Sequence, residues 1–557
     1  MIYYRRDVSG FTLRWDGEVA NHARANGFWA NRTLADFAKP IASAMPDRIM
    51  VREGDRIFTA RALWDEAAAL ASALRDRGYR PGDVLAFQLP NWAEANVLGL
   101  ASAMGGFVLA PIVPIYREAE VAFILAEARA KAFFIPATFR NFDYRAMAET
   151  VQPRLGRPID VFVLRGDPGR WTSYDTLIGE GDRTAIFPPV DPDALRIILF
   201  TSGTTGRSKG VFHTHNSITA ENIKTAARGG YDETYSFYMA SPVTHLTGFL
   251  YAVNMVWSRN VPVVLAPVWE PERAFDEIKA YSCAIMGGAT PFLKALVEIA
   301  EARDDYLDSL RAFACGGTSI PADLVATALR RFPNAKVSRA FGATEVPTIT
   351  LPPKDRTDIV HATQTDGLAF EVDMRIVDPD TGDVLPPDTE GEVVVKCPQM
   401  FFGYIRDDDN AEAFDENGYF RMGDIGRLDK DGWFTVTGRK KDLINRLGEK
   451  VSAKEIEDIL FTHPDVADVA IVAKPSDRTG EAVCAFVIPR AGKQPTLAEL
   501  ARFVESHGVA KQKLPEYLEL VEEFPRVPSG KVKKDILRQM AAAGAGQGIG
   551  SAESGAG

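Results

Sequence analysis

The stretch that most constrains the fold runs from residue 199 to residue 215. The apolar run 195–200 predicts a buried strand. Hydroxyl residues and glycines follow it directly, and then a lysine: Thr201, Ser202, Gly203, Thr204, Thr205, Gly206 and Lys209. Glycines let backbone N–H groups approach phosphate oxygens, while hydroxyls and a lysine add donors and positive charge. We therefore expect a loop that holds a polyphosphate. It is not a Walker A loop, and the alternative is a flexible surface loop.

Strands and helices alternate on both sides of this loop. Thr59 is expected to start a helix, and Asn91 is a candidate cap of a later one. After the loop, Asn216 or Ser217 is expected to cap a further helix. Such alternation predicts βαβ units and a largely parallel sheet. After about residue 370, short strands with glycine and aspartate turns predict an antiparallel β subdomain.

The length of 557 residues predicts more than one domain. The expected fold class is α/β, with a large N-terminal domain at residues 1–438. A polar, charged linker is expected at residues 439–442, and a small α+β domain at 443–540. Residues 541–557 are rich in alanine, glycine and serine, which predicts a disordered tail.

Composition excludes several classes of function. The net charge of −11 argues against a nucleic-acid partner. Four cysteines without a CxxC pair indicate neither a zinc site nor a disulfide framework, and His213 and His215 lack the spacing of a metal site. The uncharged window 97–115 contains a glycine pair and two prolines, so we expect a helix followed by a buried strand and no transmembrane segment. We expect a cytoplasmic protein.

Three glycine-rich turns follow apolar runs, at residues 287–291, 315–319 and 339–345. Ligands of open α/β sheets bind outside the carboxyl ends of the strands, so these turns are expected to line one site. Ordinary tight connections between strands and helices are the alternative for each turn taken alone.

Five motifs of this sequence together resemble those of the adenylate-forming superfamily, which contains acyl-CoA synthetases, peptide-synthetase adenylation domains and luciferases. They lie at residues 199–215, 341–345, 420–424, 438–442 and 525–532, in the order found in that family. The resemblance spans roughly residues 30 to 540 and is strongest to cyclohexanecarboxylate and medium-chain acyl-CoA ligases. It implies ATP, Mg²⁺ and coenzyme A as cofactors, and a small C-terminal domain that moves.

The resemblance also implies which residues bind the nucleotide. In the order of the chain they are Thr201, Ser202, Gly203, Thr204, Thr205, Gly206, Lys209, Gly316, Gly317, Thr318, Phe341, Gly342, Ala343, Thr344, Asp424 and Arg439. Phe341 is expected to stack on adenine, Thr344 to contact the α-phosphate, and Glu345 with Thr204 to bind Mg²⁺, a cation that prefers carboxylate and phosphate oxygens. The chain departs from the family pattern at Ala340, at Phe341 and at Met422.

Further roles are implied for the second half of the chain. Asp424 is expected to accept hydrogen bonds from both ribose hydroxyls, and Arg439 to contact the ribose. Lys441 occupies the hinge position, and Gly448 lies in the loop expected to admit coenzyme A. Lys531 matches the catalytic lysine, a cation that stabilises charge in the transition state at the α-phosphate. The expected catalytic residues are Lys531, Thr344, Glu345 and Lys209.

The acid pocket is expected between the phosphate loop and the glycine turns. Its candidate walls are Val243, His245, Leu246, Phe249, Gly288, Ala289 and Thr290. They are uncharged and mostly apolar, which predicts an acid with an apolar body and no second carboxylate. His245 is expected to shape the pocket, with a packed or capping histidine as the alternative.

We therefore expect an ATP-dependent carboxylic acid–CoA ligase that forms an acyl-adenylate and then a thioester. The expected partner is a small alicyclic, aryl-alkanoic or medium-chain acid, with a monomer or homodimer as the oligomeric state. One alternative is an aryl-acid adenylating enzyme that loads a carrier-protein thiol. The other is a non-catalytic adenylate or acyl-CoA binding protein.

Overall fold

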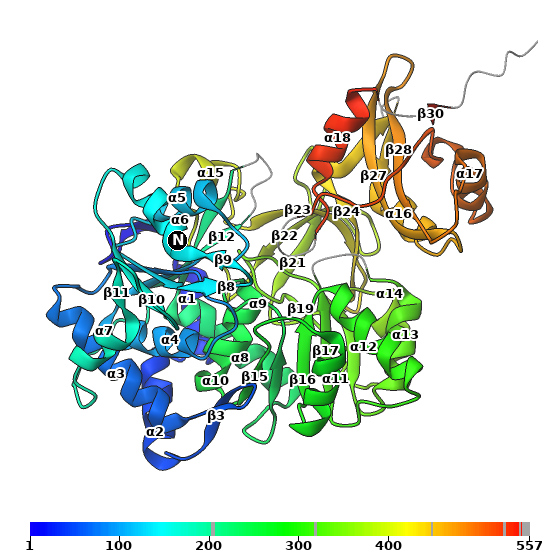
Figure 1. Cartoon of the computed structure of the whole chain (residues 1–557). Helices are drawn as coiled ribbons and strands as arrows, with labels where there is room; N and C mark the ends of the chain where they lie inside the picture. Colours follow the sequence, from blue (N-terminus) through cyan, green and yellow to red (C-terminus); the bar gives the residue numbers. More distant parts are fainter. Residues whose placement is uncertain (202–206, 317–319, 447–448, 527–530, 545–546, 549–557) are drawn as a thin grey trace, which may run out of the picture.

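The computed structural model describes residues 1–201, 207–316, 320–446, 449–526, 531–544 and 547–548. Figure 1 shows a large part, drawn from blue to yellow, and a smaller part, drawn in orange and red. The large part contains two seven-stranded sheets and one four-stranded sheet, and the smaller part is built on a further sheet. This α/β architecture, with an added antiparallel sheet and a small C-terminal unit, is the predicted fold class.

The first seven-stranded sheet carries the predicted phosphate loop. Its order is β11 (Thr172–Ser173), β10 (Asp160–Leu164), β7 (Ala132–Pro136), β5 (Val84–Phe87), β6 (Val108–Pro111), β12 (Leu195–Thr201) and β13 (Lys209–Thr214). All neighbouring pairs are parallel except the antiparallel β12–β13 hairpin. The predicted buried strand is therefore confirmed as β12, and the return strand β13 was not predicted.

The second seven-stranded sheet carries the predicted glycine turns. Its order is β18 (Lys336–Ala340), β17 (Ala312–Gly316), β16 (Ile285–Gly288), β14 (Phe237–Met239), β15 (Val263–Leu265), β3 (Ile49–Glu53) and β4 (Arg56–Thr59). Only the β3–β4 pair is antiparallel. Both sheets are thus largely parallel, as the alternation of strands and helices predicts.

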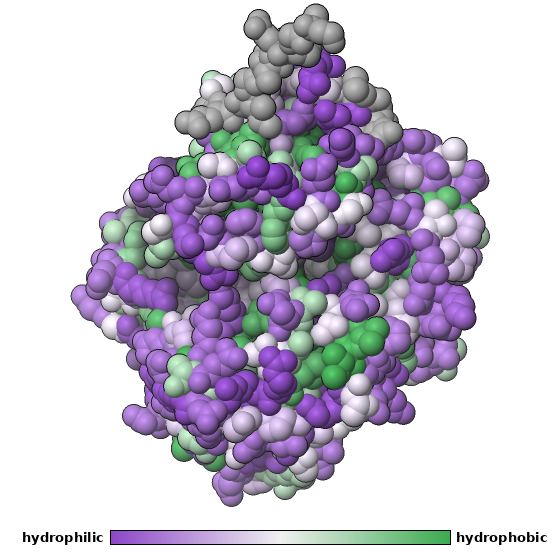
Figure 2. All heavy atoms as spheres, turned by 90° about the vertical axis from the view of Figure 1, so that its right-hand side faces the viewer, coloured by the Kyte–Doolittle hydropathy of each residue, from purple (hydrophilic) through white to green (hydrophobic). Residues whose placement is uncertain are grey.

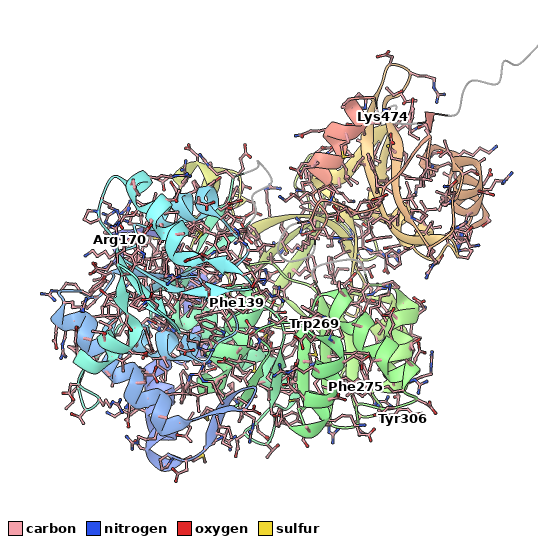
Figure 3. The ribbon with its side chains drawn as sticks, in the orientation of Figure 1. Phe139, Arg170, Trp269, Phe275, Tyr306 and Lys474 are labelled. Atoms are coloured by element: carbon pink, nitrogen blue, oxygen red, sulfur yellow. The ribbon has the colours of Figure 1, made fainter. Side chains whose placement is uncertain are left out.

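Helices cover both faces of both sheets, which is why the strands are apolar on both sides. On β7, Phe134 enters the core between the two sheets, whereas Phe133 and Ile135 enter the core on the outer face. The helices of the large part are α1 (Gly17–Ala25), α2 (Leu34–Ala44), α3 (Ala60–Asp76), α4 (Glu94–Gly105), α5 (Glu118–Glu127), α6 (Tyr144–Val151), α7 (Tyr174–Glu180), α8 (His215–Gly229), α9 (Leu246–Phe249), α10 (Met255–Ser258), α11 (Pro271–Ala280), α12 (Thr290–Ala302), α13 (Ala322–Arg331), α14 (Ile359–Gln364) and α15 (Asp407–Ala411). Phe275 of α11, labelled in Figure 3, belongs to the third core, outside the second sheet.

The window 97–115 forms a helix and a strand inside the large part. Helix α4 ends at Gly105, and Gly106 takes the left-handed conformation with φ of 68°, which glycine adopts without strain. Strand β6 follows and is fully buried. Among the described residues, no helix is both long and apolar enough to cross a membrane.

A four-stranded antiparallel sheet follows in the chain and leads to the smaller part. The short strands with glycine and aspartate turns after residue 370 predict such an antiparallel subdomain. Its strands are β21 (Asp373–Val377), β22 (Gly391–Lys396), β23 (Phe420–Leu428) and β24 (Phe434–Arg439). Three two-stranded ribbons complete the large part: β1 (Ile2–Arg6) with β2 (Thr12–Asp16), β8 (Thr138–Phe139) with β9 (Phe142–Asp143), and β19 (Thr350–Leu351) with β20 (Leu368–Ala369).

The smaller part packs three helices on its own sheet. Its strands are β25 (Leu443–Arg446), β26 (Glu449–Ser452), β27 (Val466–Ser476), β28 (Gly480–Pro489), β29 (Tyr517–Leu520) and β30 (Gln547–Gly548), and its helices are α16 (Ala453–Leu460), α17 (Leu497–Ser506) and α18 (Lys534–Ala542). Lys474 of β27, labelled in Figure 3, donates to the Ala541 carbonyl oxygen at 2.5 Å and so ties the sheet to α18. Helix α18 ends at Ala542, so the first two residues of the predicted tail, 541 and 542, are helical.

Two predicted helix caps are wrong. Thr59 does cap α3, but the side chain that caps α8 is Thr214, in a reciprocal arrangement with Ser217. Asn91 caps no helix. Helix α4 starts at Glu94 and has no side-chain cap. The Asn91 side chain instead forms hydrogen bonds with the backbone of the segment after β14, at Ser241 and Val243.

All four cysteines are free and buried, at Cys283, Cys315, Cys397 and Cys484. Burial raises the pKa of each thiol to about 12, because the thiolate loses its hydration.

The surface of the molecule differs from this buried core in hydropathy. Figure 2 shows hydrophilic side chains over most of the face at the right of Figure 1, with several apolar areas, the most extended of which lies in the lower half of the view.

Candidate functional site

The glycine turns meet at one edge of the second sheet. Strands β16, β17 and β18 are adjacent and parallel, and the register pairs Gly288 with Cys315 and Gly316 with Ala340. A Cβ on Gly316 would lie 2.6 Å from the Ala340 carbonyl oxygen, so a side chain does not fit there. The strand ends are thus together as predicted. Gly317 and Thr318 lie outside the described residues.

The predicted phosphate loop leaves the first sheet and returns to it at one point. Thr201 at the end of β12 pairs directly with Lys209 at the start of β13. The residues between them that were predicted to hold phosphate, Ser202, Gly203, Thr204, Thr205 and Gly206, lie outside the described residues. What the structure supplies is the position of the two ends of the loop.

Lys209 is connected to Glu345 through a tyrosine that was not predicted. Its Nζ lies 3.1 Å from Asp409 Oδ1 and 4.8 Å from the centroid of the Tyr404 ring. The Tyr404 hydroxyl donates to Glu345 Oε1 at 2.7 Å. Burial and the negative charge of Glu345 raise the pKa of Tyr404, so its hydroxyl stays protonated. No sequence pattern pointed to Tyr404 or Asp409, because their contacts join segments far apart in the chain.

The segment after β18 folds back on itself. The Phe341 N–H donates to Thr350 Oγ1 at 2.8 Å, and the Phe341 ring packs against Phe434 with centroids 4.8 Å apart. Ala343 and Val346 exchange backbone hydrogen bonds of 3.1 and 3.2 Å. The backbone that carries Thr344 and Glu345 is therefore a closed turn.

Thr348 occupies a strained position at the end of this turn. Its φ of 41° is rare for a β-branched residue. A Cβ on Gly342 would lie 2.5 Å from the Thr348 nitrogen, so the predicted Gly342 is needed for this close approach. Lys224 of α8 is buried and donates to the Thr348 carbonyl oxygen at 2.7 Å, and burial lowers its pKa to about 8. Lys224 was not predicted, and its hydrogen bond connects helix α8 to the end of this turn.

His213 supports the same turn from β13. Its Nε2–H donates to the Thr344 carbonyl oxygen at 2.8 Å, and its Nδ1 accepts from the Ser217 hydroxyl at 3.2 Å. Burial lowers the pKa of His213 to about 4, so the ring is neutral near pH 7. His213 is therefore a hydrogen-bonding residue that holds the turn at Thr344.

Acid should destabilise the protein through His213. An unfolded histidine titrates near pH 6.5, so between pH 6.5 and 4 the unfolded state binds more protons and stability falls as the pH falls. The full shift corresponds to about 3 kcal/mol. His213→Gln, which keeps an amide donor for Thr344, should remove this component. Denaturant unfolding of both proteins at pH 7, 5.5 and 4.5 measures it, and parallel pH curves would contradict it.

Asp424 and Arg439 form an ion pair across two strands. They are register partners on β23 and β24, and Arg439 Nε lies 2.8 Å from Asp424 Oδ1. Burial raises the pKa of Asp424, and the positive charges of Arg439 and Lys531 oppose this effect. The two predicted ribose contacts are therefore side by side. Their role in binding ribose stays a prediction.

Lys531 of the smaller part faces residues of the large part. Its charge interacts with those of Arg439, Asp424, Glu345 and Lys441. Burial and then repulsion by Arg439 lower its pKa, although the residue keeps exposed surface. The structure thus brings the predicted catalytic lysine to the predicted nucleotide residues. Gly448, predicted on the coenzyme A side, lies outside the described residues.

Two neighbouring segments carry the predicted acid pocket. Val243, His245, Leu246 and Phe249 follow β14, while Gly288, Ala289 and Thr290 follow β16, the strand paired with β14. Asn91 holds the first segment: its side chain donates to the Ser241 carbonyl oxygen at 3.0 Å and accepts from the Val243 N–H at 2.8 Å. Asn91, which was expected to cap a helix, thus holds the backbone of this region.

His245 is a capping residue, which was the alternative expectation, and its role in shaping the acid pocket stays a prediction. It precedes α9 and its Nδ1 accepts from the Thr247 N–H at 3.5 Å, as a capping residue does. Burial and the positive charge of Lys531 lower its pKa to about 4. His245, within the predicted acid segment, is therefore neutral near pH 7 and is electrostatically coupled to the predicted catalytic lysine.

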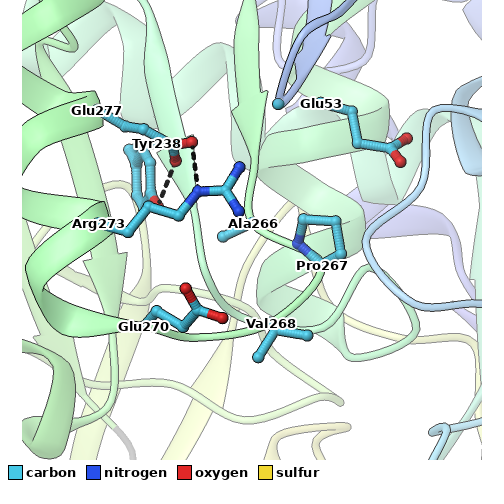
Figure 4. A pocket seen from close by; sticks show the side chains of 9 residues that line it. Glu53, Tyr238, Ala266, Pro267, Val268, Glu270, Arg273 and Glu277 are labelled. Carbon is cyan, nitrogen blue, oxygen red and sulfur yellow. Dashed lines mark hydrogen bonds and ion pairs between the residues drawn. The ribbon is translucent and has the colours of Figure 1, made fainter. Parts of the chain in front are cut away.

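A cavity of about 170 Å³ opens away from these residues. Figure 4 shows its lining: Glu53, Gly54, Tyr238, Ala266, Pro267, Val268, Glu270, Arg273 and Glu277. Arg273 Nε and the Tyr238 hydroxyl both donate to Glu277, at 2.9 and 3.0 Å. No residue predicted to bind ATP or the acid lines this cavity.

The metal-binding donors of the site are few. Among the described residues, no group of three or more His, Cys, Asp or Glu side chains surrounds a common point. Glu345 offers one carboxylate, with Oε1 already bound by Tyr404. This fits a magnesium ion, which is typically held by one or two carboxylates together with substrate phosphates and water.

Comparison with known proteins covers nearly the whole chain. Residues 39–405 match the family described as AMP-binding enzyme, and residues 455–531 match its C-terminal domain. A medium-chain fatty-acid–CoA ligase of Escherichia coli (strain K12) is 34% identical over 545 residues, covering 97% of this chain and 95% of that protein.

Two further comparisons are with an aryl-acid ligase and with an ATP-bound crystal structure. A 2,3-dihydroxybenzoate-AMP ligase of Bacillus subtilis (strain 168) is 31% identical over 541 residues, covering 96% of this chain and 98% of that one. The crystal structure of ATP-bound MatB from Rhodopseudomonas palustris has a TM-score of 0.81 at 25% identity, covering 91% of this chain and 98% of that one.

Proposed function

The chain belongs to the AMP-binding enzyme family, and from this membership we propose that it is an ATP-dependent carboxylic acid–CoA ligase. At the coarser level it is an adenylate-forming ligase of acyl or aryl acids. The observation that carries the proposal is the electrostatic coupling of Lys531, on the smaller part, to Asp424 and Glu345 of the large part.

In the first half-reaction a carboxylate oxygen attacks the α-phosphorus of ATP. An O–P bond forms, the bond between the α-phosphorus and the bridging oxygen breaks, and pyrophosphate leaves. Lys531 stabilises the negative charge on the acid and the α-phosphate, while Lys209 stabilises charge on the leaving pyrophosphate. Asp424 and Arg439 orient the ribose.

Glu345, with Thr204 of the phosphate loop, would hold Mg²⁺. The ion supplies neutralisation of phosphate charge when bound. The closed turn at residues 343–346 keeps the Glu345 backbone in place, since Ala343 and Val346 bond to each other and His213 binds the Thr344 carbonyl oxygen.

In the second half-reaction the thiol of coenzyme A replaces AMP on the acyl group. The thiol proton passes to solvent, sulfur bonds to the carbonyl carbon, and the bond from that carbon to AMP breaks. For the thiol to enter, the smaller part rotates about Lys441 and withdraws Lys531. The ion pair of Arg538 with Asp442, at 2.8 Å, connects α18 to the segment next to this hinge.

The acid is proposed to be alicyclic, aryl-alkanoic or medium-chain. Val243, Leu246 and Phe249 are buried apolar residues, which suits an acid with an apolar body. The similarity to a medium-chain fatty-acid–CoA ligase supports this class. The second candidate is an aryl-acid adenylating enzyme that loads a carrier-protein thiol, and similarity to a 2,3-dihydroxybenzoate-AMP ligase supports its aryl-acid specificity.

A panel of acids assayed for pyrophosphate release, with and without coenzyme A, separates these candidates. We expect an acid with an apolar body to release pyrophosphate, and coenzyme A to raise turnover about tenfold or more by consuming the adenylate. Pyrophosphate exchange without stimulation by coenzyme A would favour the carrier-protein enzyme. Absence of AMP and pyrophosphate with every acid would favour a non-catalytic binding protein.

A further inference from the structure

Tyr404 makes two contacts that connect different elements of the nucleotide site. Its hydroxyl donates to Glu345 Oε1 at 2.7 Å, and its ring faces Lys209 Nζ, 4.8 Å from the ring centroid. The side chain is 6% exposed. Tyr404 thus lies between the residue proposed to hold Mg²⁺ and the lysine proposed to hold the leaving phosphates.

The backbone around Tyr404 is held from two directions. Asn410 accepts from the Tyr404 N–H at 2.8 Å and donates to its carbonyl oxygen at 3.1 Å. On the other side, the Phe212 N–H donates to the Gly403 carbonyl oxygen at 3.1 Å and the Ile405 N–H to Gly210 at 2.9 Å. The segment is therefore attached to β13, the strand that begins with Lys209.

Glu345 is held at both its backbone and its side chain. The Phe401 N–H donates to the Glu345 carbonyl oxygen at 2.8 Å. Among the described residues, Tyr404 provides the one hydrogen bond to the Glu345 carboxylate. A carboxylate has two oxygens, so a donor on Oε1 fixes the rotation of the group and leaves Oε2 for a cation.

We propose that Tyr404 is a positioning residue for the metal ion, holding Glu345 Oε2 in the direction of the phosphates that Lys209 binds. This inference rests on the proposed function, since it takes Glu345 to be the magnesium-binding carboxylate. Without the hydroxyl the carboxylate rotates freely, and magnesium must order it on binding.

The test is Tyr404→Phe, which removes the hydroxyl and keeps the ring under Lys209. Calorimetric titration with MgATP, in the absence of acid and coenzyme A, should show a Kd about tenfold higher than in the wild type, as expected for a lost hydrogen bond to a charged group. Titration with ATP in EDTA should give a Kd within about twofold of the wild type. In activity assays the KM for Mg²⁺ should rise by a similar factor.

Tyr174→Phe is the matched control. The Tyr174 hydroxyl also donates to a glutamate, Glu66 Oε1, at 2.8 Å, but this pair connects α7 to α3. Both variants lose one partly buried Tyr–Glu hydrogen bond, whereas only Tyr404→Phe should change the affinity for MgATP. An equal change in both variants, or equal changes with and without magnesium, would overturn the inference.

A double-mutant cycle gives a second, independent measurement. Tyr404→Phe introduced into Glu345→Gln should change the Kd for MgATP by less than about threefold, because both substitutions act on one carboxylate. Additive effects would show that Tyr404 acts through another group. A wild-type protein that binds no MgATP would instead refute the proposed function, so the two failures are distinguishable.

Discussion

Replacing Lys531 with alanine should slow formation of the acyl-adenylate by about 100- to 1000-fold. The charge of Lys531 is coupled to those of Asp424, Glu345 and Arg439, and under the proposed function its ammonium stabilises the charge that accumulates during attack on the α-phosphate. Thioester formation from a chemically prepared acyl-adenylate should change by less than about threefold, because in the proposed mechanism the lysine withdraws before the thiol attacks. Single-turnover kinetics of each half-reaction measures the two effects separately.

Lys533→Ala is the control for this experiment, since it removes a lysine two residues away. Its rates should remain within about threefold of the wild type in both half-reactions. If Lys531→Ala kept adenylate formation and lost thioester formation, the role proposed for Lys531 would be wrong. Loss of both half-reactions together with a lowered Tm would indicate a defect of folding.

Replacing Glu345 with glutamine should reduce the adenylation rate by about 100-fold or more at ordinary magnesium concentrations. An amide lacks the charge that a divalent cation requires, and charge stabilisation by the metal contributes several kcal/mol to such reactions. Glutamine has nearly the same size, and its amide oxygen still accepts from the Tyr404 hydroxyl. The effect is therefore expected on metal binding and not on folding, and rates measured across a magnesium titration report it.

Two comparisons limit the interpretation of Glu345→Gln. Affinity for ATP in EDTA should stay within about twofold of the wild type. Glu416→Gln, at an exposed turn residue, should leave the magnesium dependence unchanged. A Glu345→Gln enzyme with normal rates at low magnesium would show that another group holds the ion.

The sequence predicted the parts of the fold that depend on local pattern. The strand β12, the helix capped by Thr59 and the helix that ends at Gly105 follow from apolar runs, caps and glycines, and the structure confirms them. The cap of α8 was placed wrongly at Asn216 or Ser217, because the unpredicted strand β13 ends at Thr214 and starts the helix earlier. Strand β13 was missed since its pairing is tertiary.

The residues of the candidate site were predicted by resemblance to a family and not by local pattern. Motifs such as 341–345 identify them, and in the structure Glu345, Asp424, Arg439 and Lys531 interact electrostatically. Their roles stay predictions. Tyr404 and Lys224 were not found, since a tyrosine and a lysine in otherwise ordinary segments show their importance only through contacts with residues 59 and 124 positions away.

The buried cysteines have a practical consequence for measuring this enzyme. All four thiols are at most 3% exposed, and with a pKa near 12 they contain almost no thiolate at neutral pH. A chromogenic disulfide reagent added to the folded protein should therefore titrate free coenzyme A with negligible background. One cysteine placed on the surface of each part would accept donor and acceptor maleimide dyes without prior removal of native cysteines, so the proposed rotation of the smaller part becomes measurable by energy transfer.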